Sequence, residues 1–422
     1  MNQTQYLMDL AQEAFPGGVL GRHKFDLPGG HIPKTGLGGR LYDTNGNSFV
    51  DYSIGGGSLI LGYNHPAIIR AIQKQAEEAT QFISIVNEPA ILLGKKITEV
   101  ISWADKVRFT ASGADAVMFA LRIARAFTKR QKIIKFDGAY HGNSDYTLWN
   151  LSNLSNNEHE GEPSSAGIPD VIRQLVLIGE YNNLQHTRNI VKENPGEIAA
   201  IILEPVQRFY RASEEFLLGL RKLCDEENIL LVFDEIVTGF RHALGGAAEA
   251  YGVEPDLGAF GKAIGGGIPL GAVAGRESMM DFANPDRSLS DGYTYVTSSQ
   301  AGNPLCTSVS LATLEELSKP GVYENMFDKI NHLKREAAKI IEKKSVDAQV
   351  VGDGPLWDIA FTKEQIFNNA TANKADQKRL KLFHQNLVEN GVMVRIGGRS
   401  YFSTAHNEED IEVTLEAIYN SL

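Results

Sequence analysis

Lys262 has the surroundings that most clearly indicate chemistry. It lies in residues 258–276, GAFGKAIGGGIPLGAVAGR, after a short apolar run and before three consecutive glycines and a proline. A Rossmann glycine motif opens a helix directly after a strand, whereas these glycines lead into Pro269 and a further apolar run. A P-loop would need glycine at Asp256 and serine or threonine at Ala263. Both nucleotide-binding interpretations therefore fail. Two others remain open: a surface lysine in a turn, or a partly buried amine that forms a Schiff base with a carbonyl.

An upstream carboxylate favours the covalent interpretation. Asp234 ends the apolar run in LLVFDEIVTGFR, and a buried carboxylate is costly unless it has a partner. It could cap the following turn, or it could pair with the protonated ring nitrogen of pyridoxal phosphate, a cofactor that serves as an electron sink. Ser112 and Gly113 lie where a predicted strand meets a predicted helix, so the free N–H groups there could bind the phosphate. Ordinary helix capping would explain the same two residues.

The elements that must position these residues form an alternating pattern up to about residue 310. Two β-rich runs flank a stretch with helical spacing of apolar residues, and later apolar runs lack alternation, as expected for strands buried on both faces. These runs are 105–112, 132–138, 198–206, 229–237 and 272–275. The pattern predicts an α/β fold with a mostly parallel central sheet flanked by helices.

After residue 310 the pattern changes to long charged helical stretches, then short strands near WDIAF, VMVRI and YFSTA. A last helix is predicted to start at Asn407, a good N-cap. We expect an N-terminal segment, 1–50, that packs with a smaller α+β domain, 311–422, and a large cofactor-binding domain between them, 51–310. The polar stretch 143–169 is either a lid or binding loop, or a plain surface excursion.

Composition excludes several classes of protein. The 422 residues carry a formal net charge of −11, which disfavours nucleic acid or an anionic membrane as the main partner. Two cysteines, Cys224 and Cys306, make neither a disulfide framework nor a metal-ligand cluster, so we expect a reducing compartment and no metal. The first residues lack signal-peptide features, and no run approaches the ~20 apolar residues that span a bilayer. We therefore expect a cytoplasmic protein.

The sequence resembles a class III, fold-type I, pyridoxal-phosphate-dependent aminotransferase, and within that class it is most similar to the glutamate-1-semialdehyde aminomutase subgroup. The resemblance extends over nearly the whole chain, and motifs in one order carry it: FPGGV, GGRLYDTNGNSFVDY, LILGYNHP, SGADAVMFALRIAR, FDGAYHG, AGIP, IILEPV, LLVFDEIVTGFR, FGKAIGGGIPLGAVAG, AGNPL and AHNEEDI. It implies a fold-type I transferase fold and pyridoxal 5′-phosphate as the cofactor.

The resemblance also implies residue roles. Lys262 would hold the cofactor covalently and then move a proton between substrate and cofactor, and Asp234 would pair with the ring nitrogen. The other implied cofactor-binding residues are Ser112, Gly113, Ala114 and Ser299 around the phosphate, Tyr140 and Ile236 on the two faces of the ring, and His141, Glu204 and Val237 nearby. In this family the residue at Ser299 comes from the other subunit, so the resemblance implies a homodimer with its active site at the interface.

Two departures from the family pattern bear on the substrate. Aminomutases carry a glutamate where ungapped counting places Gly398, and here the next residue is Arg399, whose planar guanidinium suits a carboxylate. Arg399 and Arg22 match arginines of the subgroup's transaminases for β-amino acids, while Tyr295 matches a substrate-pocket tyrosine of the aminomutases. Each arginine could also be an ordinary surface residue. Among the residues expected around the phosphate, Ala114 replaces the usual threonine. The loss of one hydroxyl lowers the binding free energy of the cofactor by on the order of 1 kcal/mol.

The expected activity is therefore amino-group transfer by a ping-pong mechanism, between an amino acid donor, with β- or ω-amino acids as candidates, and a 2-oxo acid acceptor. An aminomutase-type isomerase is the alternative. A racemase or decarboxylase on the same cofactor ranks below both. A non-catalytic binding protein ranks last, because Lys262 and Asp234 are both present.

Overall fold

The computed structural model describes residues 3–21, 30–83, 85–151, 161–287 and 292–422, and these form two compact units. The first unit comprises Met1–Pro66, Gly321–Glu364 and Lys374–Leu422, and the second comprises Ala67–Pro320 and Gln365–Asn373. The boundaries thus fall at residues 66 and 320, where the sequence suggested 50 and 310, and a short later segment returns to the second unit.

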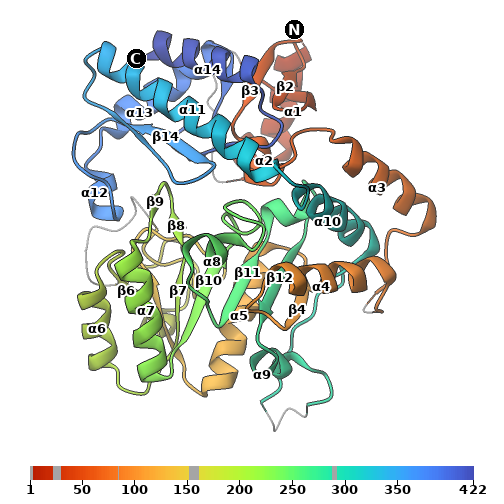
Figure 1. Ribbon diagram of the computed structural model, residues 1–422, viewed down its shortest axis with the longest axis vertical. Helices are drawn as coiled ribbons and strands as arrows, with labels where there is room; N and C mark the ends of the chain where they lie inside the picture. Colours follow the sequence, from red (N-terminus) through yellow and green to blue (C-terminus); the bar gives the residue numbers. More distant parts are fainter. Residues whose placement is uncertain (1–2, 22–29, 84, 152–160, 288–291) are drawn as a thin grey trace. The chain divides into compact units, whose positions relative to one another are not determined.

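The second unit is built on a seven-stranded sheet (Figure 1). In spatial order its strands are β4 (Lys106–Thr110), β12 (Gly271–Gly275), β11 (Leu257–Phe260), β10 (Leu230–Glu235), β7 (Ile198–Leu203), β5 (Lys132–Phe136) and β6 (Val176–Gly179). Only β12 runs antiparallel to its neighbours; the other neighbouring pairs are parallel. The predicted mostly parallel α/β sheet is confirmed. Its central strands β7, β10 and β11 are buried at every position, as their unbroken apolar runs indicated.

Helix α5 (Gly113–Thr128) begins at its N-cap Ser112 and packs against β4, β12, β11, β10 and β7. Its buried side chains include Val117, Leu121 and Ala124, the positions that recur at helical spacing in the sequence. The other helices of this unit are α3 (Pro66–Glu78), α4 (Glu88–Val100), α6 (Leu184–Glu193), α7 (Glu214–Glu227), α8 (Gly246–Tyr251), α9 (Glu277–Met280), α10 (Pro304–Leu317) and α12 (Asn369–Asn373). Shorter pieces are the hairpin β8 (Val206–Gln207) and β9 (Tyr210–Arg211), and the 3₁₀ turns η2 (Asp170–Leu175), η3 (Lys262–Gly265) and η4 (Asp281–Ala283).

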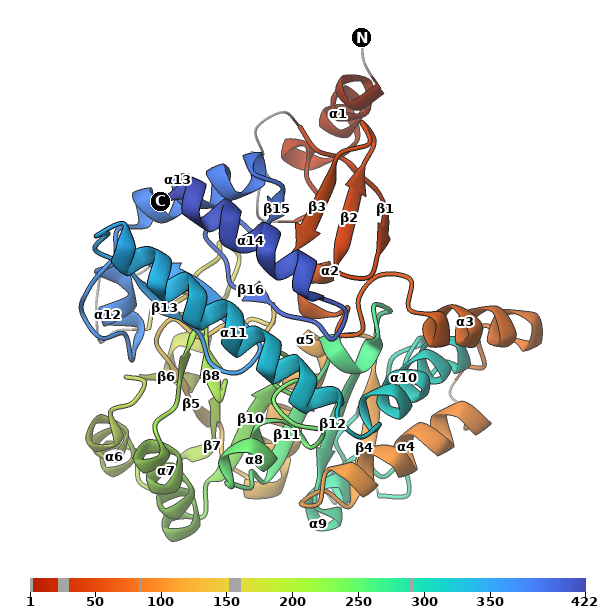
Figure 2. The same cartoon turned by 45° about the horizontal axis from the view of Figure 1, so that its top comes forward.

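The first unit is a smaller α+β structure, as the C-terminal sequence indicated (Figure 2). Its four-stranded sheet joins β1 (Pro33–Leu37), β2 (Arg40–Asp43) and β3 (Ser48–Asp51) to the late strand β15 (Val392–Met393), which runs parallel to β3. A second sheet contains β13 (Gln349–Val351), β14 (Leu356–Ala360) and β16 (Ser400–Tyr401). The helices are α1 (Gln3–Ala14), α2 (Ile54–Gly57), α11 (Val322–Lys343), α13 (Gln377–Glu389) and α14 (Glu408–Ser421), with the 3₁₀ turn η1 (Pro16–Gly18).

Two details of the first unit bear on its stability. Asn407 caps α14 through a capping box with Asp410, so the predicted helix start is confirmed. In the core, the ring of His406 stacks on Tyr52 with 4.5 Å between ring centroids, and the Tyr52 hydroxyl hydrogen bonds to Thr414. Across the whole described chain, the helices include none with the length and apolar character needed to cross a membrane.

Candidate active site

The segments that carry most of the predicted site residues follow the carboxyl ends of strands in the second unit's sheet. Ser112 follows β4, Tyr140 and His141 follow β5, and Glu204 follows β7 directly. Asp234 is the penultimate residue of β10, and Lys262 comes two residues after β11. Because these strands all run in one direction, their carboxyl ends lie along one edge of the sheet, where open α/β sheets bind ligands.

Asp234 is the buried carboxylate of this edge, with 4% of its surface exposed. Its Oδ2 lies 2.7 Å from Nδ1 of His141, and its Oδ1 accepts a hydrogen bond of 3.0 Å from the Ile236 N–H. These two contacts fix the carboxylate plane and leave lone pairs for a further donor. Nε2 of His141 is buried and has no hydrogen-bond partner among the described residues.

The start of α5 lies against the turn that follows Asp234. The Ser112 Oγ accepts a hydrogen bond of 3.2 Å from the Asp115 N–H, which caps the helix. A Cβ added at Gly113 would lie 2.6 Å from Cδ1 of Ile236, and one added at Gly261 would lie 3.2 Å from the same atom. The helix N-terminus, the Ile236 side chain and the backbone that precedes Lys262 are therefore packed together, closely enough that a side chain at position 113 would force Ile236 or the helix start to move.

The segment after β5 is the third part of the chain that borders this edge of the sheet. The Tyr140 N–H donates to Oε1 of the buried Glu204 at 3.0 Å, while 46% of Tyr140 is exposed. Gly142 has φ +92°, and a Cβ there would lie 2.8 Å from Cα of Ala114 in the first turn of α5. Tyr140 thus presents its ring to solvent from a backbone that is held at both ends.

Lys262 has an unusual backbone. It is half-buried, and its φ of +46° places it in the left-handed region, which costs a non-glycine residue about 1 kcal/mol. Such strain concentrates at functional positions, where the surrounding structure enforces it. The left-handed residue follows Gly261 and opens η3.

The positions of the other predicted residues give less support for a role in the site. Ser299 is exposed, and its carbonyl accepts a hydrogen bond from Gln81; 64% of Tyr295 is exposed. Neither hydrogen bonds to Asp234 or His141 within the described part of the chain. Val237 is buried, and its carbonyl accepts from Nε of Arg241.

The predicted substrate arginines belong to a different part of the chain. Arg399 is half-buried in the first unit, after Gly398, where an added Cβ would lie 2.6 Å from Cδ of Arg395. Arg22 lies outside the described residues.

Sequence reasoning missed two buried ionisable groups near this edge. Lys135 in β5 is fully buried, and burial lowers its pKa to about 7, although Asp137 and Glu204 act in the opposite direction. Glu235 is also fully buried, and burial raises its pKa to about 7. Its carboxylate accepts from the N–H groups of Ala247 and Ala248 at the start of α8. The only available signal was a charged residue inside or directly after an apolar run.

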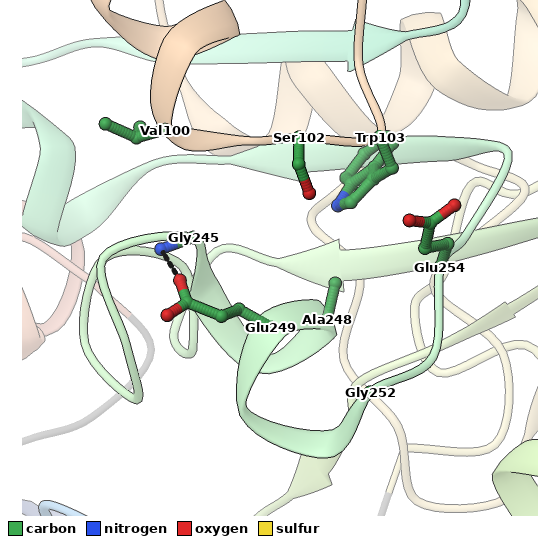
Figure 3. A pocket seen from close by; sticks show the side chains of 8 residues that line it. All are labelled: Val100, Ser102, Trp103, Gly245, Ala248, Glu249, Gly252 and Glu254. Carbon is green, nitrogen blue, oxygen red and sulfur yellow. Dashed lines mark hydrogen bonds between the residues drawn. The ribbon is translucent and has the colours of Figure 1, made fainter.

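A separate hollow of about 440 Å³ lies in the second unit, lined by residues that include Ser102, Trp103, Glu249 and Glu254 (Figure 3). In it the Gly245 N–H donates to Glu249 at 2.6 Å. Trp103 and Glu254 precede β4 and β11, so this part of the hollow belongs to the amino ends of those strands. None of the predicted site residues lines it.

Comparisons with known proteins identify the family and the fold. The family model described as aminotransferase class-III matches residues 28–418. A curated glutamate-1-semialdehyde 2,1-aminomutase from Chloroherpeton thalassium is 36% identical over 99% of this chain and 96% of its own. An omega-transaminase from Sphaerobacter thermophilus has a TM-score of 0.94 at 27% identity, covering 100% of this chain and 97% of its own. A solved structure of a transaminase with PLP bound has a TM-score of 0.91 at 26% identity, covering 100% of this chain and 98% of its own.

The residues of the carboxyl edge fit pyridoxal 5′-phosphate, which is the cofactor of this enzyme. The capped N-terminus of α5 offers N–H groups to a phosphate, and Asp234 is a buried acceptor held ready for a protonated ring nitrogen. Lys262, two residues after β11, carries an amine of the kind that forms a Schiff base with an aldehyde. Glycine at position 113 leaves the first residue of α5 without a side chain, and a Cβ there would lie 2.6 Å from Cδ1 of Ile236.

Proposed function

From the premise that this chain belongs to the class-III aminotransferases, we propose that it moves an amino group between neighbouring carbons of one substrate, as a glutamate-1-semialdehyde 2,1-aminomutase does. The observation that carries the proposal is the 36% identity to the Chloroherpeton aminomutase over nearly the whole of both chains. The sequence interpretation ranked transfer between two substrates first, and the curated relatives favour its alternative.

Different residues of the chain would perform different steps of this reaction. When bound, the cofactor supplies an electron sink that stabilises negative charge on the substrate carbon. The amine of Lys262 holds the cofactor and then moves a proton at the carbon that carries the amino group. Asp234, oriented by His141, keeps the ring nitrogen protonated. Glu204 holds the backbone of Tyr140.

The remaining residues proposed to contact the cofactor would bind and orient it. Ser112 with the N–H groups of Gly113 and Ala114 would bind the phosphate, and Tyr140 and Ile236 would hold the ring between them, with Val237 next to Ile236 in the sequence. These roles follow from the family resemblance and are supported by the packing of Gly113 on Ile236.

A second candidate is an aminotransferase that passes the amino group from one substrate to another. Gly398 favours it, because the aminomutases that the sequence resembles carry a glutamate there, and Arg399 beside it suits a substrate carboxylate. Arg22 would serve the same purpose, and Tyr295 would border the substrate. The likeness to the Sphaerobacter omega-transaminase supports the same candidate.

The working assembly is proposed to be a homodimer in which Ser299 completes the phosphate site of the other subunit. Exposed apolar side chains support an interface on the second unit: Phe82, Ile83, Ile85, Val86, Ile91 and Leu92. The cytoplasmic location stays a prediction from composition.

Product analysis tests the two candidates. Purified enzyme is given glutamate 1-semialdehyde, and the product in which the amine has moved from carbon 2 to carbon 1, 5-amino-4-oxopentanoate, is measured by chromatography. A parallel panel pairs α-, β- and ω-amino acids with pyruvate or 2-oxoglutarate. Isomerisation without release of a new oxo acid supports the aminomutase. Oxo acid formed from the donors, with no isomerisation, would replace it by the aminotransferase.

A further inference from the structure

Lys135 is a buried cation whose surroundings the proposed chemistry does not explain. It is the fourth residue of β5, between the apolar residues Ile134 and Phe136, and it has no exposed surface. A buried ammonium loses several kcal/mol of hydration unless donors and charges compensate. An apolar side chain of similar length would fill the same space without that loss, so the ammonium must be used by its neighbours.

Its hydrogen bonds go to both ends of one segment. Nζ of Lys135 donates to the carbonyl of Ala139 at 2.9 Å and also to the carbonyl of Trp149. The carboxylates of Asp137 and Glu204 favour the charged form of the lysine. One side chain therefore ties together the two ends of residues 139–149.

That segment carries three contacts to the proposed cofactor site. Directly after Ala139, the N–H of Tyr140 binds Glu204 at 3.0 Å, and His141 binds Asp234 at 2.7 Å. Gly142 then lies against Ala114 in the first turn of α5. A shift of the Ala139 carbonyl would disturb these contacts, because that carbonyl and the Tyr140 N–H belong to the same planar peptide unit, and His141 and Gly142 follow directly.

We infer that Lys135 is a positioning residue for the cofactor site: its ammonium group clamps the carbonyls of Ala139 and Trp149 and thereby holds Tyr140 and His141 in place against Glu204 and Asp234. The inference rests on the cofactor roles proposed above for Tyr140 and Asp234. Lys135 itself touches neither substrate nor cofactor; it acts through the segment that it holds.

The test compares two lysines of the same strand. Lys135→Met removes the ammonium and keeps the length of the side chain. Lys132→Met is the matched control, since Lys132 starts β5 and pairs instead with Glu197 and Asn194. Hydrogen exchange by mass spectrometry is measured on both cofactor-free proteins, and cofactor affinity by fluorescence titration.

For Lys135→Met we expect amide hydrogen exchange to be at least about tenfold faster than in the parent protein, and only in residues 137–151. The loss of the clamp opens that segment locally. Cofactor affinity should weaken by about tenfold, as expected when two hydrogen bonds that position a site are lost. Lys132→Met should change neither. If the methionine variant does not fold, Lys135→Gln, which keeps a neutral donor, should show the same local pattern at smaller amplitude.

Unchanged exchange in residues 137–151 would overturn the inference, and so would exchange that rises equally across the whole sheet, because Lys135 would then only support the fold. Faster local exchange with unchanged cofactor affinity would also overturn it. Failure of the aminomutase proposal would instead be seen in the product analysis and would leave both of these readouts as expected.

Discussion

At the scale of single residues, the backbone of Lys262 makes a prediction that is separate from its amine. With φ at +46°, any residue with a Cβ is strained there, while glycine is not. We expect cofactor-free Lys262→Gly to be about 1 kcal/mol more stable than cofactor-free Lys262→Ala. Urea unfolding of the two variants measures the difference. Both lack the amine, so equal stabilities would mean that position 262 is not strained.

Neither variant should retain cofactor after reduction with borohydride, whereas the parent enzyme should. Covalent trapping that persists in Lys262→Ala would place the bond on another lysine.

Gly113 gives a second prediction at this scale. The Cβ of Gly113→Ala would lie 2.6 Å from Cδ1 of Ile236, so either Ile236 or the start of α5 must move. We expect a loss of about 1–3 kcal/mol in the free energy of unfolding, and weaker cofactor binding. Gly94→Ala is the control, because its Cβ would meet only Val107 at 3.5 Å within α4, where alanine favours the helix. A destabilised Gly94→Ala together with an unaffected Gly113→Ala would contradict the packing argument.

Much of the candidate site could be proposed from these residue types, because a lysine among glycines, an acid at the end of an apolar strand and Ser-Gly before a helix are local patterns. Lys135 could not be predicted in this way. A lysine in the run KIIKF looks like a residue that faces solvent, and only the return of Trp149 and Ala139 to its Nζ shows what it holds. Likewise, the pairing of His141 with Asp234 joins residues far apart in the chain.

At the scale of elements, the N-terminus of α5 has a cap that the structure shows and a proposed role in phosphate binding, and a pair of serines can separate the two. Ser112 caps α5 through the Asp115 N–H, and Ser213 caps α7 through the Phe216 N–H, each at 3.2 Å. Ser112→Ala and Ser213→Ala should each lower the free energy of unfolding by about 1 kcal/mol. Only Ser112→Ala should also weaken cofactor binding, measured by titration of the cofactor-free protein. Equal affinities in the two variants would remove Ser112 from the phosphate site.

His406, which lies in the connection between β16 and α14, makes the first unit sensitive to acid. Burial lowers the pKa of His406 to about 4, and its Nδ1 accepts from the Ser403 N–H, which a proton on Nδ1 would oppose. Because the folded pKa lies below the unfolded value of 6.5, the unfolded state binds more protons between pH 6.5 and 4. Stability should therefore fall as pH falls through that window, by as much as roughly 3 kcal/mol.

Urea unfolding at pH 7 and at pH 4.5 measures this loss. His406→Gln, which cannot titrate, should be less stable at pH 7 but should lose less on acidification. An equal loss in both proteins would show that other groups control the acid response.

The order of elements was predictable where apolar runs were long, and not where pairing is distant. The runs at 198–206 and 229–237 became β7 and β10 because strands buried on both faces must be continuously apolar. Nothing local shows that β12 runs antiparallel to its neighbours, or that Val392 pairs with Val50. The return of residues 365–373 to the second unit is equally non-local, since Asn369 there donates to Asp137.

At the scale of the whole molecule, the exposed apolar residues between 82 and 92 predict self-association. Ile85 is 67% exposed and Val86 80%, and such a cluster is costly to leave in water unless another surface covers it. We expect the parent protein to sediment as a dimer and the double variant Ile85→Asp, Val86→Asp to sediment as a monomer, because a buried unpaired carboxylate opposes association.

Leu218→Asp is the control for this change, since Leu218 is also exposed but belongs to α7, outside the cluster. It should leave the parent assembly intact. If Ser299 completes the phosphate site of the other subunit, the monomeric double variant should also bind cofactor more weakly than Leu218→Asp does, and Ser299→Ala should weaken binding in the dimer. A monomeric variant with full cofactor affinity would mean that each chain holds its cofactor alone, and Ser299 would then have no place in the site.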